Sequence, residues 1–294
     1  MLDVHDRLDR WVPITSFPAP GTKLRCGVSG GADSLALMAL GVAAGCEVTA
    51  VHVDHGQRVG SADESTQVAT LAMTIGADFE SALVDVKPGS NLEARMRAAR
   101  YEVLGPHAAT GHTMDDQAET VLINLMRGSG LKGLGAMSHG HRRPILGLRR
   151  VDTEAVCEAL GWEPFNDPSN TDPAFVRNRV RAELIPLLSD IANRDVVPLL
   201  ARTSANARSA NEVVALAAAE LDPTDARALV AVPNAVAAVA IQTWVQRETA
   251  TEYPIDRASI ERVLDVAKGN AVAAEVTGGF RVARSKQRLR LIPQ

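Results

Sequence analysis

The chain has 294 residues and a mass of 31.2 kDa, and 46% of its residues are hydrophobic and 22% charged, as in a soluble globular protein of one or two domains. A net charge of −4 and a pI near 6.0 exclude a protein that is basic overall, so any contact with nucleic acid must come from a local patch. An aromatic content of 3% argues against a stacking platform for single-stranded nucleic acid.

Cysteine usage and the N-terminus both favour a cytoplasmic protein. The three cysteines, at positions 26, 46 and 157, form neither a C-x-x-C pair nor a zinc-site spacing, which is typical of a reducing compartment. The N-terminal residues are too charged for a signal peptide, and no apolar run approaches the ~20 residues that span a bilayer. We therefore expect no membrane role, and we expect Cys26 to be buried filler rather than a nucleophile.

The first part of the chain predicts strands that alternate with helices. A short amphipathic helix is expected within residues 1–22, strands over 24–28, 47–53, 78–86 and 107–111, and helices after Gly31, from Ser61, from Ser90 and over 115–126. This spacing implies an α/β fold, a Rossmann-like parallel sheet with right-handed crossovers and helices on both faces. Ligands of such sheets bind at the carboxyl ends of the strands.

The pattern loosens after residue 127. The Gly-rich and basic segment from Gly128 to Arg143 predicts a surface excursion, and helices are expected over 153–160, 176–188 and 196–221. Asp222-Pro223 marks the predicted boundary between a larger domain, 1–221, whose part 128–221 is a basic and helical extension, and a smaller mixed α+β domain, 222–294. The smaller domain is expected to contain helices over 234–247 and 255–268 and a closing strand pair around Gly278-Gly279.

The sequence KLRCGVSGGADSLALMAL, from Lys23 to Leu40, predicts a strand, a tight loop and a helix. Two glycines let the loop backbone approach a ligand closely, and Asp33 or Ser34 is expected to cap the helix. Free backbone N–H groups and the positive end of the helix dipole then converge on one point, which is an arrangement that binds phosphate. We call residues 29–34 the phosphate loop.

Two better-known phosphate motifs do not fit this chain. A Walker loop requires a lysine after its last glycine, and none stands near Gly31. The pattern G-x-G-x-x-G occurs at Gly128, Gly130 and Gly133, but it follows a predicted helix rather than a strand, so we interpret it as a chance match. The phosphate loop instead resembles the S-G-G-x-D-S loop of the ATP pyrophosphatase (PP-loop) superfamily, whose members split ATP between its α and β phosphates. For the loop alone, an ordinary Gly-rich turn is the alternative.

Further motifs follow in order along residues 24–190. They are His52-Val53-Asp54-His55-Gly56, Asn91 to Glu93 with Arg97 and Arg100-Tyr101, Gly111-His112 to Thr120, Arg127 to Leu134, Arg143-Pro144, Asp167 to Asn170, and Arg177 to Arg181. Together with the phosphate loop, this series resembles the tRNA(Ile)-lysidine synthetase family. The departures from the family pattern, at Asp54, Met96 and Thr113, remove no group that the chemistry needs.

The resemblance implies an ATP-dependent ligase that forms a carbon–nitrogen bond. Members of this family adenylate C2 of the wobble cytidine in the isoleucine tRNA with a CAU anticodon, and the side-chain amine of free lysine then displaces AMP to give lysidine. The implied cofactors are ATP and Mg²⁺, and the implied partners are that tRNA and lysine. Whether the chain forms a homodimer is left open.

The resemblance also assigns roles to individual residues. The expected catalytic residues are Asp33, Asp116, Arg97 and His112, and Asp33 and Asp116 are the expected metal ligands. ATP is expected to contact Ser29, Gly30, Gly31, Ala32, Asp33, Ser34, His52, Val53 and Asp54. Two alternatives stay open. Asp33 also suits a helix cap, and the acids Asp115, Asp116 and Glu119 suit a helix N-terminus as well as metal binding or deprotonation of lysine.

Contacts with tRNA or lysine are expected from basic segments. The first set is Arg100, Arg177, Asn178, Arg179 and Arg181, for which ion pairs to Glu183 or Asp172 are the alternative. The second set is Arg284, Lys286, Arg288 and Arg290, whose two-residue spacing would place all four on one face of a strand. We predict that this basic stripe binds tRNA, with a solvated outer strand face as the alternative.

Two other functions remain to be separated from this one. The chain could be another PP-loop ligase that modifies tRNA, such as a thiolase, or that forms an amide, or it could be a non-catalytic module that senses ATP. Thiolases of the superfamily characteristically rely on cysteines or an iron–sulfur cluster, and three isolated cysteines argue against that chemistry. A sensor would need neither the acids at 115–119 nor the arginine-rich second half.

Overall fold

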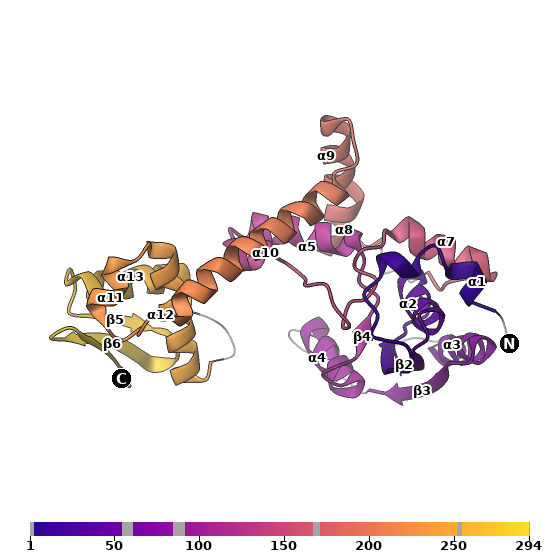
Figure 1. Ribbon diagram of the computed structural model, residues 1–294, viewed down its shortest axis with the longest axis horizontal. Helices are drawn as coiled ribbons and strands as arrows, with labels where there is room; N and C mark the ends of the chain where they lie inside the picture. The colour runs from indigo at the N-terminus through magenta and orange to yellow at the C-terminus, as the bar shows by residue number, and fades with distance from the viewer. Residues whose placement is uncertain (1–2, 55–60, 85–91, 167–170, 252–254, 294) are drawn as a thin grey trace. The chain divides into compact units, whose positions relative to one another are not determined.

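The computed structural model describes residues 3–54, 61–84, 92–166, 171–251 and 255–293 (Figure 1). The chain divides into two compact units, Met1–Ala205 and Asn206–Gln294. The division falls inside the long helix α10 (Val197–Ala219), whose C-terminal end lies close to the boundary that the sequence predicts at Asp222. Along the described residues, no helix combines the length and the apolar composition that crossing a membrane requires.

The first unit contains a four-stranded parallel sheet, as the sequence predicts. Its strands are β1 (Lys23–Gly27), β2 (Glu47–Asp54), β3 (Asp78–Leu83) and β4 (Ala109–Thr110), in the spatial order β3-β2-β1-β4. The chain adds β2 and β3 on one side of β1 and then returns to place β4 on the other side. The carboxyl ends of β1 and β4 therefore form the topological switch point of the sheet, where open α/β sheets bind their ligands.

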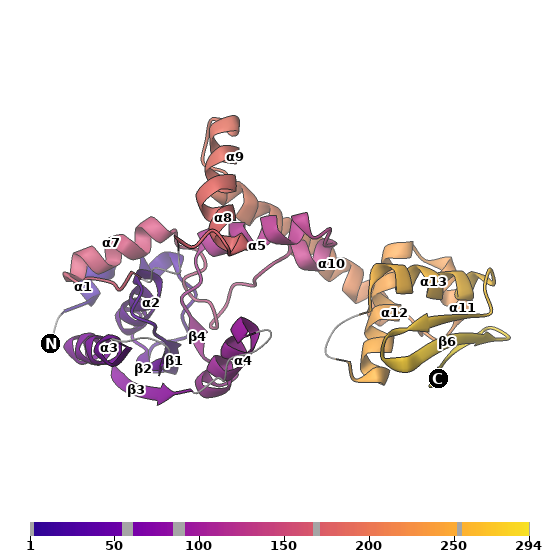
Figure 2. The same cartoon turned by 180° about the vertical axis from the view of Figure 1, so that it is seen from behind.

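Helices cover both faces of this sheet (Figures 1 and 2). They are α2 (Ala32–Ala43) and α3 (Ser61–Ile75) on one face and α4 (Leu92–Leu104) on the other. Alternate residues of β2 point to the two faces, because Val48 and Ala50 join the core with α2, whereas Val51 packs with Leu104. The N-terminal elements α1 (His5–Leu8) and η1 (Val12–Ile14) are shorter than expected, but Leu8 is fully buried.

Residues 128–143 lie mostly at the surface, as predicted, and the chain returns to the core directly after them. After the short helix α6 (Leu131–Leu134), the apolar residues Ile145, Leu146 and Leu148 are all fully buried. Burial of each such side chain contributes roughly 1.5–3 kcal/mol, which holds the end of the excursion to the core. The backbone at Leu148 also contacts the loop that follows β4, since the Met114 N–H donates to the Leu148 carbonyl over 2.7 Å.

The first unit contains further helical elements. They are α5 (Met114–Met126), α7 (Arg150–Leu160), α8 (Val176–Arg179), a π-helical segment η3 (Val180–Leu184) and α9 (Ile185–Ala192). Helix α7 begins three residues before the predicted start at Thr153, and this places Arg150 in its first turn. Leu122 and Ile123 of α5 pack with Val180, which fixes η3 against α5.

The second unit is a separate α+β core. Its elements are α11 (Ala226–Ala231), α12 (Asn234–Thr249), α13 (Arg257–Lys268), β5 (Ala273–Val276), η4 (Thr277–Gly279), β6 (Phe280–Ser285) and β7 (Arg288–Pro293). The three strands form an antiparallel sheet in the order β5-β6-β7. Its inner face contributes Ala274, Val282 and Leu289 to a buried cluster that includes residues of α12 and α13. The predicted strand pair around Gly278-Gly279 is therefore present as β5 and β6.

The prediction of one continuous basic stripe is wrong. A tight turn at Lys286 and Gln287 separates β6, which carries Arg284, from β7, which carries Arg288 and Arg290. Arg284 is paired in register with the buried Leu289, so it lies on the inner face, where its guanidinium donates to the Ala267 carbonyl over 2.8 Å. Only part of the predicted set can therefore share a face.

Candidate active site

The phosphate loop connects β1 to α2 at the switch point of the sheet. Gly30 has a φ of +87°, a conformation that favours glycine, and its carbonyl accepts a hydrogen bond of 2.9 Å from the Phe165 N–H. The Ser34 hydroxyl accepts a bond from the Ser29 N–H over 3.1 Å and donates to the Gly31 carbonyl over 2.9 Å, which closes the loop on itself. The first turn of α2 therefore starts from a fixed backbone, as phosphate binding requires.

The prediction that Asp33 or Ser34 caps α2 is wrong. The helix begins at Ala32, its N-cap is Gly31, and no side chain caps it, so Asp33 lies within the first turn. Its carboxylate instead meets helix α7, where Oδ1 accepts a hydrogen bond of 2.5 Å from Thr153 and Oδ2 lies 3.7 Å from Arg150 Nε. Burial raises the pKa of Asp33, and the Thr153 hydrogen bond and the Arg150 charge oppose that rise.

The loop after β4 approaches the phosphate loop so closely that only glycine fits. A Cβ atom on Gly111 would lie 2.7 Å from the Asp33 carbonyl oxygen and 3.1 Å from the Ser34 backbone nitrogen. These neighbours are backbone atoms, so a side-chain movement cannot relieve the clash. Gly111 thus sets the close approach between the start of α2 and the loop that leads into α5.

Histidines occupy two of the predicted positions around this loop. His112 follows Gly111, and its Nδ1 lies 2.7 Å from the Thr110 hydroxyl. His52 is buried, and its Nδ1 lies 2.8 Å from the carbonyl oxygen of Val28, the residue before the phosphate loop. His52 therefore supports the loop from inside the sheet, while Val53 and Asp54 end β2 at the same edge.

The acids at the start of α5 point in different directions. Asp116 caps its own helix, because its Oδ2 accepts from the Thr113 N–H over 2.9 Å, and it turns Oδ1 toward Arg150 at 3.6 Å. Asp115 is held by Arg149 and by the Arg150 N–H, the latter over 2.8 Å. Burial by itself raises the pKa of Asp115, but these hydrogen bonds outweigh it and the pKa is lowered.

Glu119, one turn further along α5, is fully buried and collects three arginines. It accepts two hydrogen bonds from Arg181, of 2.7 and 3.3 Å, and it lies 3.5 Å from Arg177 and 3.7 Å from Arg150. The pKa of Arg181 is raised despite burial, because the hydrogen bond and charge of Glu119 favour the guanidinium form. Arg181 belongs to η3, and π-helical turns occur often at functional sites.

We name this group the acid–arginine cluster: Asp33, Asp116, Glu119, Arg150, Arg177 and Arg181. Four of its members were expected from the sequence as site residues. Arg150 was missed because α7 was predicted to begin after it, and Glu119 was expected only as one of three acids, among which Asp116 was favoured. Arg179 points elsewhere and forms an exposed ion pair of 2.9 Å with Glu183, which is the alternative that the sequence left open. Asn178 binds the Asp172 carbonyl over 2.9 Å.

Several predicted positions are not tested by this geometry. Arg100 is exposed on α4, and the side chain of Arg97 on the same helix lies outside the described part of the chain. The motif residues His55, Gly56 and Asn91 and the segment 167–170 also lie outside the described residues. Their assignments stay predictions.

The described carboxylates suit a magnesium–phosphate complex better than an all-protein metal cage. Among the residues that the structure places, no three His, Cys, Asp or Glu side chains are grouped to hold a metal by themselves. Mg²⁺ is usually held by one or two carboxylates together with water and substrate phosphates. Asp33 and Asp116 lie 3.7 and 3.6 Å from Arg150, so the two carboxylates are close to one another, around the Arg150 guanidinium and beside the phosphate loop.

Comparison with known proteins places this site in a family. The model of the PP-loop domain matches residues 7–188. A tRNA(Ile)-lysidine synthase of Nocardia farcinica is 37% identical over 295 residues, covering 94% of this chain and 92% of the relative. Those of Rhodococcus opacus and Mycobacterium leprae are 41% and 40% identical, each over 76% of this chain and over 70% and 75% of the relative.

A solved structure supports the fold. The U34-tRNA thiolase NcsA of Methanococcus maripaludis, with its 4Fe-4S cluster, superposes with a TM-score of 0.54 over 68% of this chain and 78% of its own, at 18% identity. Its likeness concerns the fold alone, whereas the sequence relatives extend over both units of the chain. The chain therefore belongs to the tRNA(Ile)-lysidine synthase family of PP-loop proteins.

Proposed function

We propose that this chain converts the wobble cytidine of the isoleucine tRNA with a CAU anticodon into lysidine, using ATP and free lysine. The curated relatives are tRNA(Ile)-lysidine synthases. The single observation that carries the proposal to the residues is the acid–arginine cluster beside the phosphate loop. Fold likeness alone would not suffice, because one fold supports different chemistries.

The reaction needs activation because C2 of cytosine carries an oxygen that is a poor leaving group. Attack of that oxygen on the α-phosphorus of ATP forms the adenylate and releases pyrophosphate. The lysine amine then forms a bond to C2, and AMP leaves with the oxygen. Each step develops charge on a phosphate, so the site must supply donors and cations at fixed positions.

In the first step, the phosphate loop faces the departing pyrophosphate. Its backbone N–H groups and the start of α2 suit an anion. Asp33 and Asp116 are the residues that would hold Mg²⁺, which shields phosphate charge when bound. Arg177 and Arg181, held in place by the buried Glu119, provide positive groups for the adenylate or for a tRNA phosphate.

In the second step, the Asp116 carboxylate is better placed than that of Glu119 to bind the lysine amine. Its Oδ1 has only loose contacts, 3.6 Å to Arg150 and 3.8 Å to Arg181. Glu119 is instead engaged by two N–H bonds from Arg181, of 2.7 and 3.3 Å. We therefore assign binding of the lysine amine to Asp116, and positioning of Arg177 and Arg181 to Glu119.

We expect label from lysine to enter the anticodon when the protein is incubated with ATP, magnesium and the unmodified tRNA. The same mixture without lysine should release pyrophosphate and accumulate adenylated tRNA, because the base is activated before the amine arrives. Both products can be separated by chromatography of nuclease digests. A transcript with uridine at the wobble position is the control, and formation of lysyl-AMP would show that the amino acid is activated instead.

A thiolase is the second candidate, because the NcsA structure shares the fold, but the cysteines disfavour it. Cys26, Cys46 and Cys157 are all buried. Burial raises the pKa of Cys26 and Cys46 and, as the main effect, raises that of Cys157 to about 12. Because the thiolate is the reactive form, none of the three suits sulfur transfer or cluster ligation.

We expect the folded protein at pH 8 to react with a chromogenic disulfide reagent at least ~100-fold more slowly than the protein unfolded in guanidinium, since buried thiols stay protonated. The absorbance time course measures this ratio. Rapid reaction of even one thiol in the folded state would reopen the sulfur-transfer alternative.

A further inference from the structure

Thr153 of helix α7 makes the closest contact to the Asp33 carboxylate. The side chain is fully buried, and its Oγ1 lies 2.5 Å from Asp33 Oδ1 and 2.8 Å from the Arg150 carbonyl oxygen. A hydroxyl has one proton, and the nearer and more strongly accepting partner is the carboxylate. Thr153 therefore donates to Asp33.

This bond determines which way the carboxylate faces. With Oδ1 engaged by Thr153, Oδ2 is the oxygen turned toward the Arg150 guanidinium, at 3.7 Å. Arg150 in turn lies 3.6 Å from Asp116 Oδ1, so Oδ2 of Asp33 faces the same cation as the second carboxylate. Without the hydroxyl, the carboxylate could rotate about χ2, which is a broad torsion for aspartate.

The start of α7 is itself fixed, so Thr153 is a rigid support. The Arg149 guanidinium binds both oxygens of Asp115, each over 3.1 Å, and also binds Asp195. The Arg149 N–H donates to Asp152 over 2.8 Å, which caps the helix. Helix α7 is thus anchored to α5 through Arg149, and it contacts Asp33 on α2 through Thr153.

We propose that Thr153 is a positioning residue that orients Asp33 for magnesium-bound ATP. The inference rests on the role of Asp33 in the proposed function. It adds to the site a residue outside the phosphate loop and the acid motif of α5, and it gives the first turns of α7 a part in nucleotide binding.

The test compares Thr153→Val, which keeps the shape and removes the hydroxyl, with Thr153→Ser, which keeps the hydroxyl. Thr74→Val is the matched control, because the Thr74 hydroxyl donates within its own helix α3, to the Leu71 carbonyl over 2.6 Å. Calorimetry measures binding of α,β-methylene ATP, which cannot be cleaved between those phosphates, with and without magnesium.

We expect Thr153→Val to weaken binding about tenfold with magnesium and to leave it unchanged without magnesium. The substitution removes a hydrogen bond to a charged group, and that loss affects affinity only when the Asp33 carboxylate takes part in binding through magnesium. Thr153→Ser should stay within about threefold of the wild type, and Thr74→Val should match it. The inference fails if Thr153→Val binds like Thr74→Val, or if it loses affinity equally under both conditions.

If Thr153→Val does not fold, Thr153→Ala also removes the hydroxyl and provides the same comparison with a smaller side chain. This binding assay uses neither tRNA nor lysine. Absence of lysidine formation together with the magnesium-specific loss would refute the proposed function and support the role of Thr153. Lysidine formation without that loss would support the proposed function and refute the role of Thr153.

Discussion

Replacing Asp33 by asparagine is expected to lower tRNA-dependent pyrophosphate release at least ~100-fold, a loss typical of removing one preorganised charged group from a transition state. Asparagine keeps the size of the side chain but has no charge with which to hold magnesium. Affinity for tRNA should stay within about twofold, since Asp33 is proposed to serve phosphate and metal rather than RNA. Coupled detection of pyrophosphate and a filter-binding assay measure the two quantities.

The control for this variant is Asp63→Asn. Asp63 is also an acid in the first turn of a helix, α3, but it is exposed and lies outside the acid–arginine cluster. It should release pyrophosphate at the wild-type rate. If Asp33→Asn retains a rate within severalfold of the wild type, the assignment of Asp33 to magnesium and phosphate is wrong.

The sheet and the phosphate loop were predictable because their signals are local. Short apolar runs, the glycines at 30 and 31 and the helical spacing after them lie within one stretch of sequence. The resemblance also pointed to Asp33 and Asp116, which lie together beside Arg150. It did not identify Arg150 or Thr153, because their role depends on α7 packing beside α2 and α5, and contacts over that separation leave no periodic pattern.

One error comes from a local pattern that fits two structures. The two-residue spacing from Arg284 to Arg290 fits one strand, yet it also fits two strands joined by a tight turn. Lys286 adopts that turn with a φ of +56°, which is uncommon outside glycine, asparagine and aspartate, so no residue in the sequence signalled it.

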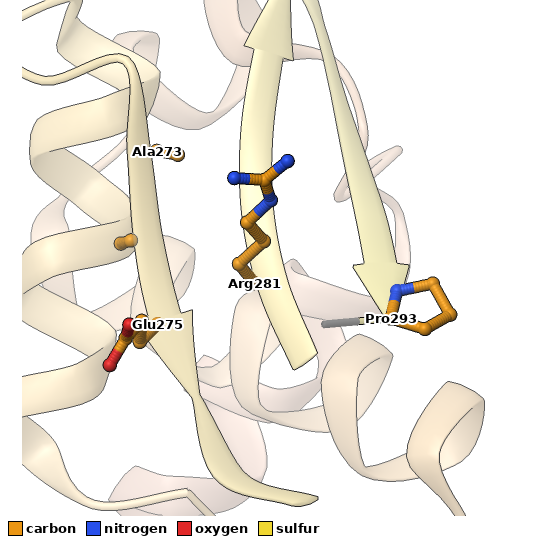
Figure 3. A pocket seen from close by; sticks show the side chains of 5 residues that line it. Ala273, Glu275, Arg281 and Pro293 are labelled. Atoms are coloured by element: carbon orange, nitrogen blue, oxygen red, sulfur yellow. The ribbon is translucent and has the colours of Figure 1, made fainter. Parts of the chain in front are cut away.

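The strand register defines a different basic surface on the second unit. Arg281 pairs with Ile292, and Ala283 pairs with Arg290, so Arg281, Arg288 and Arg290 lie on the outer face of the sheet, opposite Arg284. Glu275 is paired with Arg281 on the same face (Figure 3). Arg288 is engaged by Asp222, whose pKa is lowered to about 2 by hydrogen bonds from Thr224 and by Arg288. The outer face therefore carries three arginines and one strand-paired acid.

We expect changing Arg281, Arg288 and Arg290 together to serine to weaken tRNA affinity and to flatten its salt dependence, with a loss of up to roughly 0.7–0.9 in the logarithmic slope for each phosphate contact removed. Arg288 should contribute least, because a phosphate must displace Asp222 from it. Binding of ATP should not change.

The charge-matched control replaces the exposed Arg227, Arg247 and Arg257, which lie on helices of the same unit, by serine. Titrations at two salt concentrations measure both slopes. Equal slopes for the two triple variants would mean that the outer face is only a solvated surface, whereas a loss confined to the sheet variant would identify it as a tRNA-binding face.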